Sequence, residues 1–461
     1  MEHLISVILA AGEGKRMKSK NSKVTHRICG KTIIDWVYKA VSESGIDDTV
    51  VVVGHRSDQV KEVLGSRVKY AEQKKQLGTG HAAMQAIDYL KGREGYVLVL
   101  YGDTPLVTSK TLSEAVSYHK SNNFAATVIT AEVKEPYGYG RIVRKGNGDI
   151  EKIVEHRDAS EQEKSINEIN SGMYCFTINH LVKALEELTN NNSQGEYYLT
   201  DTIQILAGKD LRVGAFKIAD SAEIAGINDR IQLAEAVKIL NRRILNRHME
   251  SGVTILDPDS TFIDEEVSIG MDTIIYPGTI LEGKTSIGED CIIGPSSRLV
   301  SAVIGNGVEI SNSIILESSI GDNTKVGPFA YVRPGSNIGS KVKIGDFVEI
   351  KNSVIGDKSK VPHLAYVGDA ELGRNVNYGC GSITANYDGK DKHKTVIGDN
   401  TSVGSNVNLV APVVVQKDAY IAAGSTITEE VPENSLAIAR SKQVIKENWV
   451  KDKGMERKEK E

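Results

Sequence analysis

The chain has few cysteines, which argues against two kinds of site, and few aromatic residues, which indicates a kind of fold. Its 461 residues include four cysteines, and no two of them form a C-x-x-C pair: Cys29, Cys175, Cys291 and Cys380. This spacing favours neither a disulfide framework nor a cysteine-based zinc site. Aromatic residues make up 5% of the chain, whereas glycine occurs 43 times. Such a composition indicates a repetitive β structure with many tight turns.

Long apolar runs and a strong net charge are also missing. No run is long enough to cross a bilayer and the N-terminus has no signal-peptide pattern, so we expect a cytoplasmic protein without membrane insertion. Lys and Arg number 56 against 61 Asp and Glu, which leaves a net charge of -5. That balance is typical of a soluble globular protein and gives no indication of nucleic-acid binding.

The first half of the chain alternates short apolar runs with amphipathic stretches. The runs LISVIL, TVVVVG, YVLVLY and AATVITAEV predict buried strands, and helical spacing occurs over 33–44, 80–91 and 109–120. This alternation predicts an α/β, Rossmann-like domain with a largely parallel sheet over residues 1–229. An amphipathic stretch without a breaker predicts a connecting helix over 230–250.

The second half has a six-residue rhythm instead. Aliphatic residues recur in three registers: Ile263, Ile269, Ile275, Leu281, Ile287, Ile293 and Leu299; Ile314, Ile320, Val326, Val332, Ile338, Ile344 and Ile350; and Ile397, Val403, Leu409, Val415, Ile421 and Ile427. This pattern predicts a parallel β-helix of hexapeptide repeats over 251–461, with about nine coils if three repeats make one coil. The repeat is expected to break at 359–373 and 385–394, and such breaks are often binding loops.

A glycine-rich loop follows the first predicted strand. Its sequence, LAAGEGKRM over residues 9–17, is not the loop of nucleoside triphosphatases, because Arg16 follows Gly14-Lys15 where Ser or Thr is required. It is not a dinucleotide fingerprint either, because Met17 replaces the third glycine. Backbone amides beside Gly12 and Gly14 can still approach an anion, and Arg16 and Lys23 add positive charge. The sequence therefore predicts a phosphate-binding loop.

An acidic residue lies directly after another predicted strand. Asp103 follows YVLVLY, and a carboxylate at a strand end beside a phosphate loop is suited to hold Mg²⁺. Taken alone, Asp103 could equally cap the segment that follows it. Its proximity in the predicted sheet to the phosphate loop and to QLGTGHA (76–82) favours nucleotide chemistry.

A basic cluster interrupts the hexapeptide rhythm. Arg333 and Lys351 are 18 residues apart, which is one coil, so both are expected to project from one face and to clamp one phosphate. His363 follows in PHLAY. A lone histidine is more often a packing or surface residue, but beside two phosphate-binding candidates it is a candidate base.

The motifs in both halves resemble those of a known family. LAAGEGKRM, QLGTGHA, YGD, GYGRIV, IVEH, NSGMY and AGINDR occur in this order, followed by YVRPG, EIKNS, HLAYVGD and NYDG. The whole chain is similar to the bifunctional N-acetylglucosamine-1-phosphate uridylyltransferase/glucosamine-1-phosphate acetyltransferases. This resemblance implies synthesis of UDP-N-acetylglucosamine for peptidoglycan and lipopolysaccharide, a left-handed β-helix and a homotrimer.

The resemblance also implies roles for residues of the first half. UTP and N-acetylglucosamine 1-phosphate are the implied ligands there, with Mg²⁺ as cofactor. The implied residues are Leu9, Ala10, Ala11, Gly12, Gln73, Gly78 and Thr79 for the uridine nucleotide, Arg16 and Lys23 for the phosphates and their catalysis, Asp103 and Asn228 for Mg²⁺, and Gly140, Glu155 and Asn170 for the sugar.

In the second half the resemblance implies acetyl transfer from acetyl-CoA to glucosamine 1-phosphate. His363 is the implied base. The other implied residues are Arg333, Lys351, Tyr366 and Asn377 for the sugar phosphate, Asn386 and Tyr387 near the acetyl group, and Cys380, Ser405, Ala423 and Arg440 for coenzyme A. Lys15, Ser22 and Pro362 depart from the usual family residues without touching those assigned to chemistry.

Two other hypotheses fit the two-part layout. The chain could be a pyrophosphorylase whose β-helix only assembles or regulates it, in which case it would release no coenzyme A. It could instead be a non-enzymatic scaffold that resembles translation-factor exchange subunits. Arg333, Lys351 and His363 argue against the first alternative, and Arg16, Lys23 and Asp103 argue against the second.

Overall fold

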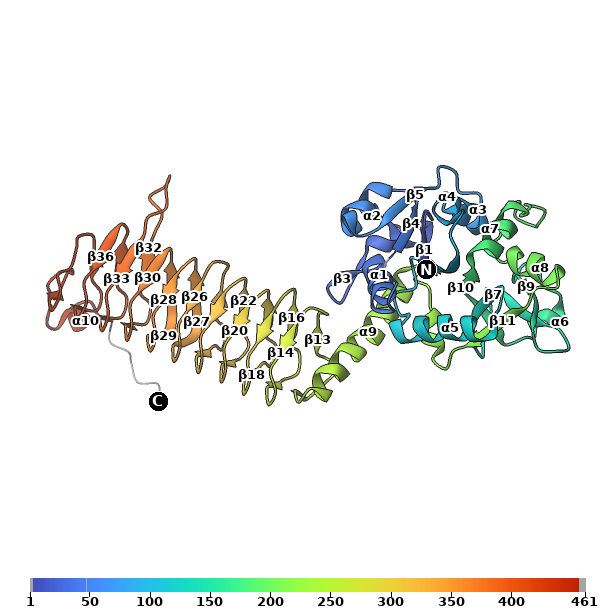
Figure 1. Cartoon of the computed structure of the whole chain (residues 1–461). Coiled ribbons are helices and arrows are strands. Elements are labelled where there is room, and N and C mark those ends of the chain that lie inside the picture. The colour runs from blue at the N-terminus through green and yellow to red at the C-terminus, as the bar shows by residue number, and fades with distance from the viewer. Residues whose placement is uncertain (1–2, 47, 456–461) are drawn as a thin grey trace. The chain divides into compact units, whose positions relative to one another are not determined.

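The computed structural model describes residues 3–46 and 48–455, which form two compact units, Met1–Arg243 and Ile244–Glu461 (Figure 1). The division falls inside the long helix α9 (Arg230–Glu250), so the predicted connecting helix is present. The finer domain limits, 1–229, 230–250 and 251–461, stay a prediction. In the part of the chain that the structure describes, no helix is both long and apolar enough to span a membrane.

The first unit alternates strands and helices. Its strands are β1 (His3–Ala10), β2 (Arg27–Ile28), β3 (Lys31–Thr32), β4 (Asp48–Val53), β5 (Lys69–Glu72), β6 (Gly95–Tyr101), β7 (Ala126–Glu132), β8 (Arg141–Arg144), β9 (Ile150–Val154), β10 (Glu168–Thr177) and β11 (Val213–Lys217). Its helices before α9 are α1 (Ile33–Glu43), α2 (Ser57–Leu64), α3 (Thr79–Met84), α4 (Ile87–Leu90), α5 (Ser109–Asn122), α6 (Glu161–Lys164), α7 (Ile178–Glu186) and α8 (Asp201–Gly208). The helix predicted over 80–91 is divided into α3 and α4, because Gln85 and Ala86 bond three residues back, to Ala82 and Ala83.

The main sheet has the order β11-β7-β10-β6-β1-β4-β5. Strands β5, β4, β1 and β6 are parallel, as predicted. The sheet is largely parallel, as predicted, and the exception in this order is β10, which is antiparallel to both β6 and β7 and separates them. The strand that follows α5, β7, therefore does not pair with β6. Strand β10, which comes later in the chain, lies between the two and runs in the opposite direction.

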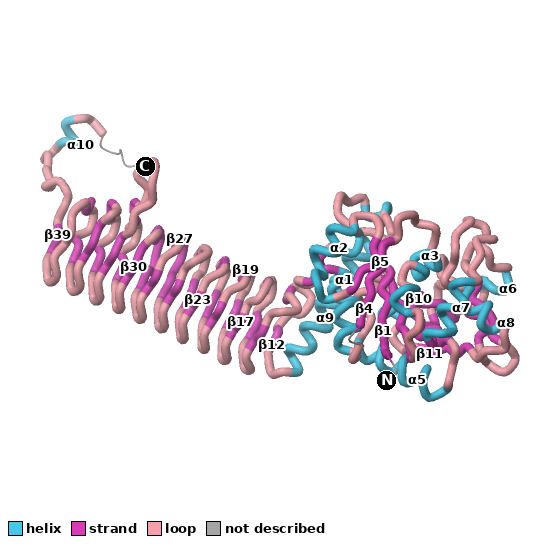
Figure 2. Tube along the Cα trace, turned by 45° about the horizontal axis from the view of Figure 1, so that its top comes forward, coloured by secondary structure: helices cyan, strands magenta, loops and turns pink. Residues whose placement is uncertain are grey.

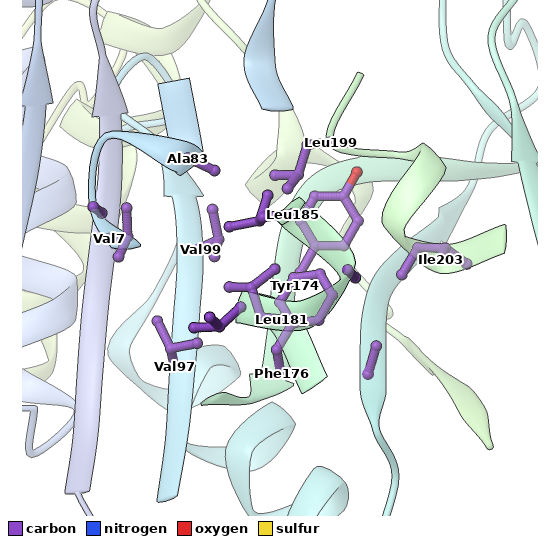
Figure 3. Packing of buried hydrophobic residues seen from close by; sticks show 14 of the residues in the cluster. Val7, Ala83, Val97, Val99, Tyr174, Phe176, Leu181, Leu185, Leu199 and Ile203 are labelled. Atoms are coloured by element: carbon purple, nitrogen blue, oxygen red, sulfur yellow. The ribbon is translucent and has the colours of Figure 1, made fainter. Parts of the chain in front are cut away.

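Apolar side chains cover both faces of this sheet. On one face Val97 and Val99 of β6 pack against Leu181 and Leu185 of α7, and Val7 of β1 belongs to the same cluster (Figure 3). A second cluster on the other face packs side chains such as Ile8 and Leu100 against α1 and α5. Because both faces are buried, the central strands are near-continuous apolar runs, and the polar groups collect at the strand ends.

The second unit is a stack of parallel coils, and each coil contributes one strand to each of three columns (Figure 2). The first column contains β12 (Thr254–Ile255), β15 (Ile274–Ile275), β18 (Ile292–Ile293), β21 (Glu309–Ile310), β24 (Lys325–Val326), the start of β27 (Lys343–Lys351), the start of β29 (Lys360–Gly368), β31 (Asn377–Tyr378), β34 (Ser402–Val403), β37 (Tyr420–Ile421) and β39 (Leu436–Ala437). The second contains β13 (Phe262–Ile263), β16 (Ile280–Glu282), β19 (Arg298–Val300), β22 (Ile314–Leu316), β25 (Tyr331–Val332), the ends of β27 and β29, β32 (Ile383–Ala385), β35 (Asn408–Val410) and β38 (Thr426–Ile427). The third contains nine strands, which agrees with the predicted number of coils: β14 (Ser268–Ile269), β17 (Ser286–Ile287), β20 (Val303–Ile304), β23 (Ser319–Ile320), β26 (Asn337–Ile338), β28 (Val354–Ile355), β30 (Ala370–Leu372), β33 (Thr395–Ile397) and β36 (Val413–Val415).

The predicted coil length holds only on average. Phe262 faces Ile280, eighteen residues on, whereas Arg298 faces Ile314, sixteen residues on. The shorter coils change one predicted inward residue, because Ile314 is exposed and the inward position belongs to Ile315. Several turns omit one residue, and a fixed period of six cannot follow them. The hand of the coil stays a prediction.

We predicted two interruptions of the coil. The prediction for 359–373 is wrong, and the one for 385–394 is confirmed. Residues 359–373 continue the coil, because β29 pairs with β27 from Lys360 to Gly368. The segment between β32 and β33 does leave the stack, and Figure 1 shows it standing out from the coils. It lengthens one coil, so that Glu371 faces Val396. Near the C-terminus a short helix, α10 (Trp449–Asp452), follows the last coil, and residues 456–461 fall outside the described residues.

One corner of the coil matters for function: the turn between the first and second columns. Its central residue has a positive φ in successive coils, including Phe329 (59°), Phe347 (54°), Leu364 (39°), Gly381 (73°) and Asn406 (53°). The side chains of Phe329, Phe347 and Leu364 are 57–59% exposed, and the two phenylalanine rings stack at 5.5 Å. The corner therefore carries a short row of exposed apolar side chains.

Candidate functional sites

The first unit contains a cavity of about 340 Å³ at the carboxyl end of β1. Its lining is Leu9, Ala10, Ala11, Gly12, Lys23, Val24, Gln73, Gln76, Gly78, Thr79, Ala82, Tyr101, Asp103 and Glu196. All seven residues predicted to contact the uridine nucleotide are among them, together with Lys23 and Asp103. A parallel strand that ends at a glycine-rich loop places backbone amides at this edge of the sheet, where ligands of α/β proteins bind.

The loop after β1 folds closely onto Lys23. Gly14 has a φ of 64°, and a Cβ added there would lie 2.7 Å from the Cβ of Lys23. Glycine is therefore required twice, for its left-handed backbone and for this close approach. The N–H of Ser22 donates to Oε1 of Gln59 at 2.7 Å, which anchors the turn before Lys23.

Lys23 meets the two predicted metal ligands. Its Nζ forms an ion pair with Oδ2 of Asp103 and lies 3.2 Å from Oδ1 of Asn228. Two oxygen donors from distant parts of the chain thus converge on one cation. The alternative role of Asp103 as a cap is not what the structure contains, because Thr108 caps α5 by accepting from the N–H of Thr111. No group of three or more His, Cys, Asp or Glu side chains among the described residues is arranged to hold a metal.

The other basic residues of the loop lie outside the cavity. Arg16 is exposed in the 3₁₀ turn Lys15–Met17. The Nζ of Lys15 lies 2.7 Å from Oε2 of Glu13, so these two charges offset each other. The structure therefore brings Lys23, and not Arg16, to the cavity.

The three predicted sugar-binding residues lie together. The N–H of Asn170 donates to the carbonyl of Gly140 at 2.9 Å, and a Cβ added at Gly140 would lie 3.6 Å from Oε1 of Glu155. Burial raises the pKa of Glu155. Tyr101 is partly buried and lines the nucleotide cavity, and the loss of solvent and the nearby Glu155 both raise the pKa of its phenol. Tyr101 thus lies between the sugar-binding residues and the cavity. The sequence alone did not assign it to either site.

In the second unit, four predicted residues occupy one position in four successive coils. His363, Cys380, Ser405 and Ala423 each precede the residue at the corner that has a positive φ, and we call this set the edge column. Coils are stacked about 4.8 Å apart, so His363 and Ala423 are separated by about 14 Å. Nη1 of Arg440 donates to the carbonyl of Ala423 at 2.8 Å and extends the edge column.

His363 lies on strand β29 and not in a loop. Its Nδ1 is 2.7 Å from Oδ1 of Asp346, which is its register partner on β27. Both side chains are about half exposed in the single chain. The hydrogen bond with His363 lowers the pKa of Asp346, so the carboxylate is ionised at neutral pH.

A group of charged and polar side chains gathers on the second column and the protruding segment. As predicted, Arg333 and Lys351 are one coil apart, since Val332 faces Ile350. Lys351 pairs with Asp369 at 3.3 Å, and Nδ2 of Asn386 donates to the same carboxylate.

We call Arg333, Lys351 and Lys392, with the polar groups beside them, the cation cluster. The sequence alone did not single out Lys392. It lies beside Lys351, whose ammonium lowers the pKa of Lys392. The hydroxyl of Tyr366 lies 3.5 Å from Nδ2 of Asn386. The signal that could have found Lys392 is the charged run of 388–394 directly after the predicted ligands Asn386 and Tyr387. Two ammonium groups held side by side are chemically suited to bind an anion.

Not every predicted ligand joins the cation cluster within one chain. Asn377 lies on β31 in the first column, where it faces Lys360 and Ser402, and so it is on the other side of the corner from Tyr366. Tyr387 is 60% exposed on the protruding segment, and its hydroxyl donates to the carbonyl of Gly389. The edge column and the cation cluster therefore flank one corner of the coil.

Comparisons with known proteins agree with this arrangement. The family described as nucleotidyl transferase matches residues 5–222, and the bacterial transferase hexapeptide family matches residues 317–352 and 394–429. A crystal structure of UDP-glucose pyrophosphorylase complexed with UDP-glucose covers 53% of this chain and 100% of its own, at 20% identity and a TM-score of 0.43, a likeness too low to support a conclusion.

Relatives match over the full length. The bifunctional protein GlmU of Acetivibrio thermocellus is 66% identical over 461 residues, which are 100% of both chains. The protein of the same name from Caldanaerobacter subterraneus subsp. tengcongensis is 60% identical over 98% of this chain and 99% of its own. Identity at this level over both units leaves no segment of the chain without a counterpart, and the chain belongs to the family of the bifunctional protein GlmU.

Proposed function

We propose that this protein is a bifunctional enzyme of UDP-N-acetylglucosamine synthesis. It transfers an acetyl group from acetyl-CoA to glucosamine 1-phosphate, and then a uridylyl group from UTP to N-acetylglucosamine 1-phosphate. The observation that carries the proposal is that each set of family motifs gathers at its own place in the fold: the nucleotide-binding residues at the cavity of the first unit, and the acetyl-transfer residues at one corner of the second.

In uridylyl transfer, an oxygen of the sugar phosphate attacks the α-phosphorus of UTP and pyrophosphate leaves. Gly12 and its neighbours bind the nucleotide, Lys23 and Arg16 neutralise its phosphates, and Gly140, Glu155 and Asn170 orient the sugar. No protein nucleophile is required, because most of the rate enhancement comes from holding the two reactants in line and neutralising their negative charges.

The residues around Lys23 fit a magnesium ion. Oxygen atoms of Asp103 and Asn228 already converge on the ammonium of Lys23, and carboxylate and amide oxygens are ligands that Mg²⁺ accepts. When bound, the ion supplies positive charge to the phosphates. Asp103 and Asn228 hold it, and Lys23 is then free to turn toward a phosphate oxygen.

In acetyl transfer, His363 takes a proton from the amino group of glucosamine 1-phosphate. The nitrogen attacks the thioester carbonyl, the C–S bond breaks, and coenzyme A leaves as the thiol. Arg333, Lys351, Tyr366 and Asn377 bind the sugar phosphate, while Asn386 and Tyr387 lie near the acetyl group. Coenzyme A lies along the edge column, over Cys380, Ser405, Ala423 and Arg440, because an extended pantetheine arm matches a row of positions that climbs about 14 Å.

We infer a homotrimer in the cytoplasm, where UTP and acetyl-CoA are made. Two features support assembly. Phe329, Phe347 and Leu364 expose an apolar row beside the edge column, which a second copy can bury. Asn377 and the cation cluster are on opposite sides of the corner, so an adjacent copy can complete the sugar-phosphate site.

Product analysis by mass spectrometry tests both activities. With glucosamine 1-phosphate, acetyl-CoA, UTP and Mg²⁺, we expect UDP-N-acetylglucosamine, pyrophosphate and coenzyme A. Without UTP the product is N-acetylglucosamine 1-phosphate, and without acetyl-CoA no acetylated sugar forms. His363→Ala is expected to lower kcat for acetyl transfer about 10²- to 10⁴-fold and to leave uridylyl transfer intact. Asp103→Ala does the reverse. A β-helix that only assembles the enzyme would release no coenzyme A under any of these conditions.

A further inference from the structure

The imidazole of His363 has a specific partner that the sequence did not assign. Asp346 on β27 is its register partner, and β27 and β29 pair in the same register before and after these two residues. Each of the two residues precedes a corner residue with a positive φ, Phe347 and Leu364 respectively. The positions of both Cα atoms are thus determined by the coil itself.

Close packing of the two strands brings the pair together. A Cβ added at Gly345 would lie 1.7 Å from the carbonyl oxygen of Pro362, so only glycine permits this approach directly before Asp346. The ring of Pro362 fixes φ directly before His363. The residues that precede the pair therefore restrict both backbones, and the 2.7 Å contact between the side chains forms without a long loop to order.

The contact selects one form of the imidazole. An ionised carboxylate can only accept a hydrogen bond, so Nδ1 of His363 carries the hydrogen and Nε2 is left with its lone pair. The negative charge also favours the imidazolium that forms when Nε2 takes a proton. The other charged or titratable groups on these strands are Lys343, Glu349 and Lys351 on β27 and Lys360 and Tyr366 on β29, and Cys380 lies one coil further on.

The geometry points to Asp346 as a positioning residue for acetyl transfer, which orients His363 through Nδ1 and presents Nε2 to the amino group of the substrate. This inference rests on the proposed function, because it assigns a partner to the proposed base. Asp346 touches no reacting atom, and its effect is exerted through the imidazole.

Two variants of Asp346 separate orientation from charge. Asp346→Ala removes the acceptor, and we expect kcat for acetyl transfer to fall about 10- to 100-fold while KM for acetyl-CoA changes by less than about 3-fold. Asp346→Asn keeps a carbonyl oxygen that accepts from Nδ1 but removes the charge. It should retain more activity than the alanine variant, because the imidazole keeps the partner that orients it.

Glu309→Gln is a matched control. Glu309 and Lys325 are also register partners on adjacent coils of the first column, with a 2.8 Å ion pair, and they lie outside the edge column and the cation cluster. This variant should keep the wild-type kcat and pH profile. Uridylyl transfer, measured on every variant in the same full-length protein, should not change and reports that the chain is folded.

The outcomes distinguish the inference from the proposed function. If His363→Ala abolishes acetyl transfer and Asp346→Ala has the wild-type kcat, the inference is wrong and the proposed function stands. The inference also fails if Asp346→Asn is no more active than Asp346→Ala. If His363→Ala itself transfers acetyl groups at the wild-type rate, the proposed function of His363 fails, whatever Asp346 does.

Discussion

At the scale of single residues, the ammonium of Lys23 lies between the two side chains that we propose as Mg²⁺ ligands, Asp103 and Asn228. The ammonium of Lys23 contacts oxygen atoms of both other residues, in the place proposed for Mg²⁺. Asn228→Ala removes one of the two oxygen donors. We expect the Mg²⁺ concentration for half-maximal uridylyl transfer to rise at least about 10-fold, measured by titrating the metal. Acetyl transfer by the same preparation is the control, and an unchanged midpoint would contradict the metal assignment.

A second residue, His119, couples the stability of the first unit to pH. It is fully buried between the hydroxyls of Thr127 and Thr177, and burial lowers its pKa to about 4. The unfolded chain takes up this proton near pH 6.5 and the folded chain only near pH 4, so stability is lost as the pH falls through this window. The free energy of unfolding should fall by about 3 kcal/mol from this group alone.

Urea unfolding measured by tryptophan emission tests the contribution of His119. The chain has two tryptophans, and replacing the exposed Trp449 by phenylalanine leaves the buried Trp36 to report on the first unit. His119→Gln can still bond a hydroxyl but cannot titrate. The wild type should lose more stability between pH 6.5 and pH 4 than this variant, and parallel losses in the two proteins would show that His119 is not responsible.

At the scale of the secondary-structure element, the contact of β27 with β29 depends on a single missing side chain. Gly345→Ala would place a methyl group 1.7 Å from the carbonyl oxygen of Pro362, so the strands must separate. We expect a loss of about 1–3 kcal/mol of stability, measured by thermal or urea unfolding. Acetyl transfer should fall with it, because the shift occurs beside Asp346 and His363. Gly146→Ala is the control, since nothing lies within 4 Å of its added Cβ. Equal stability of the two variants would refute the close-packing argument.

At the scale of the whole molecule, the two activities should respond differently to loss of assembly. Phe347 is 59% exposed in the apolar row of the corner, so Phe347→Glu should leave a single chain folded but introduce a charge into an interface. Light scattering should then show a smaller species that lacks acetyl transfer and retains uridylyl transfer. Val303→Glu, at a 58% exposed site in the third column, should remain trimeric. A trimeric and fully active Phe347→Glu would rule out this row as the interface.

The amino-acid sequence by itself determined the local features of this protein. A six-residue aliphatic period is enough to specify a coil, because each repeat must bury its own side chain against the next. The run of β1 and the glycines after it likewise specify a strand and an anion-binding loop within a few residues, and the cavity contains the predicted nucleotide-binding residues. All these features depend on neighbours in the chain.

Only the tertiary structure decided which distant residues face one another. Ile314 and Ile315 are both apolar, and only the accumulated short turns determine that Ile315 points inward. For the same reason the pairing of Asp346 with His363 depends on the length of the intervening coil. Lys392 approaches Lys351 because the chain inserts an extra segment between β32 and β33. The six-residue period does not say how many residues each turn contains. Which residues of adjacent coils face each other is decided when the packed coils pair their backbone hydrogen-bonding groups.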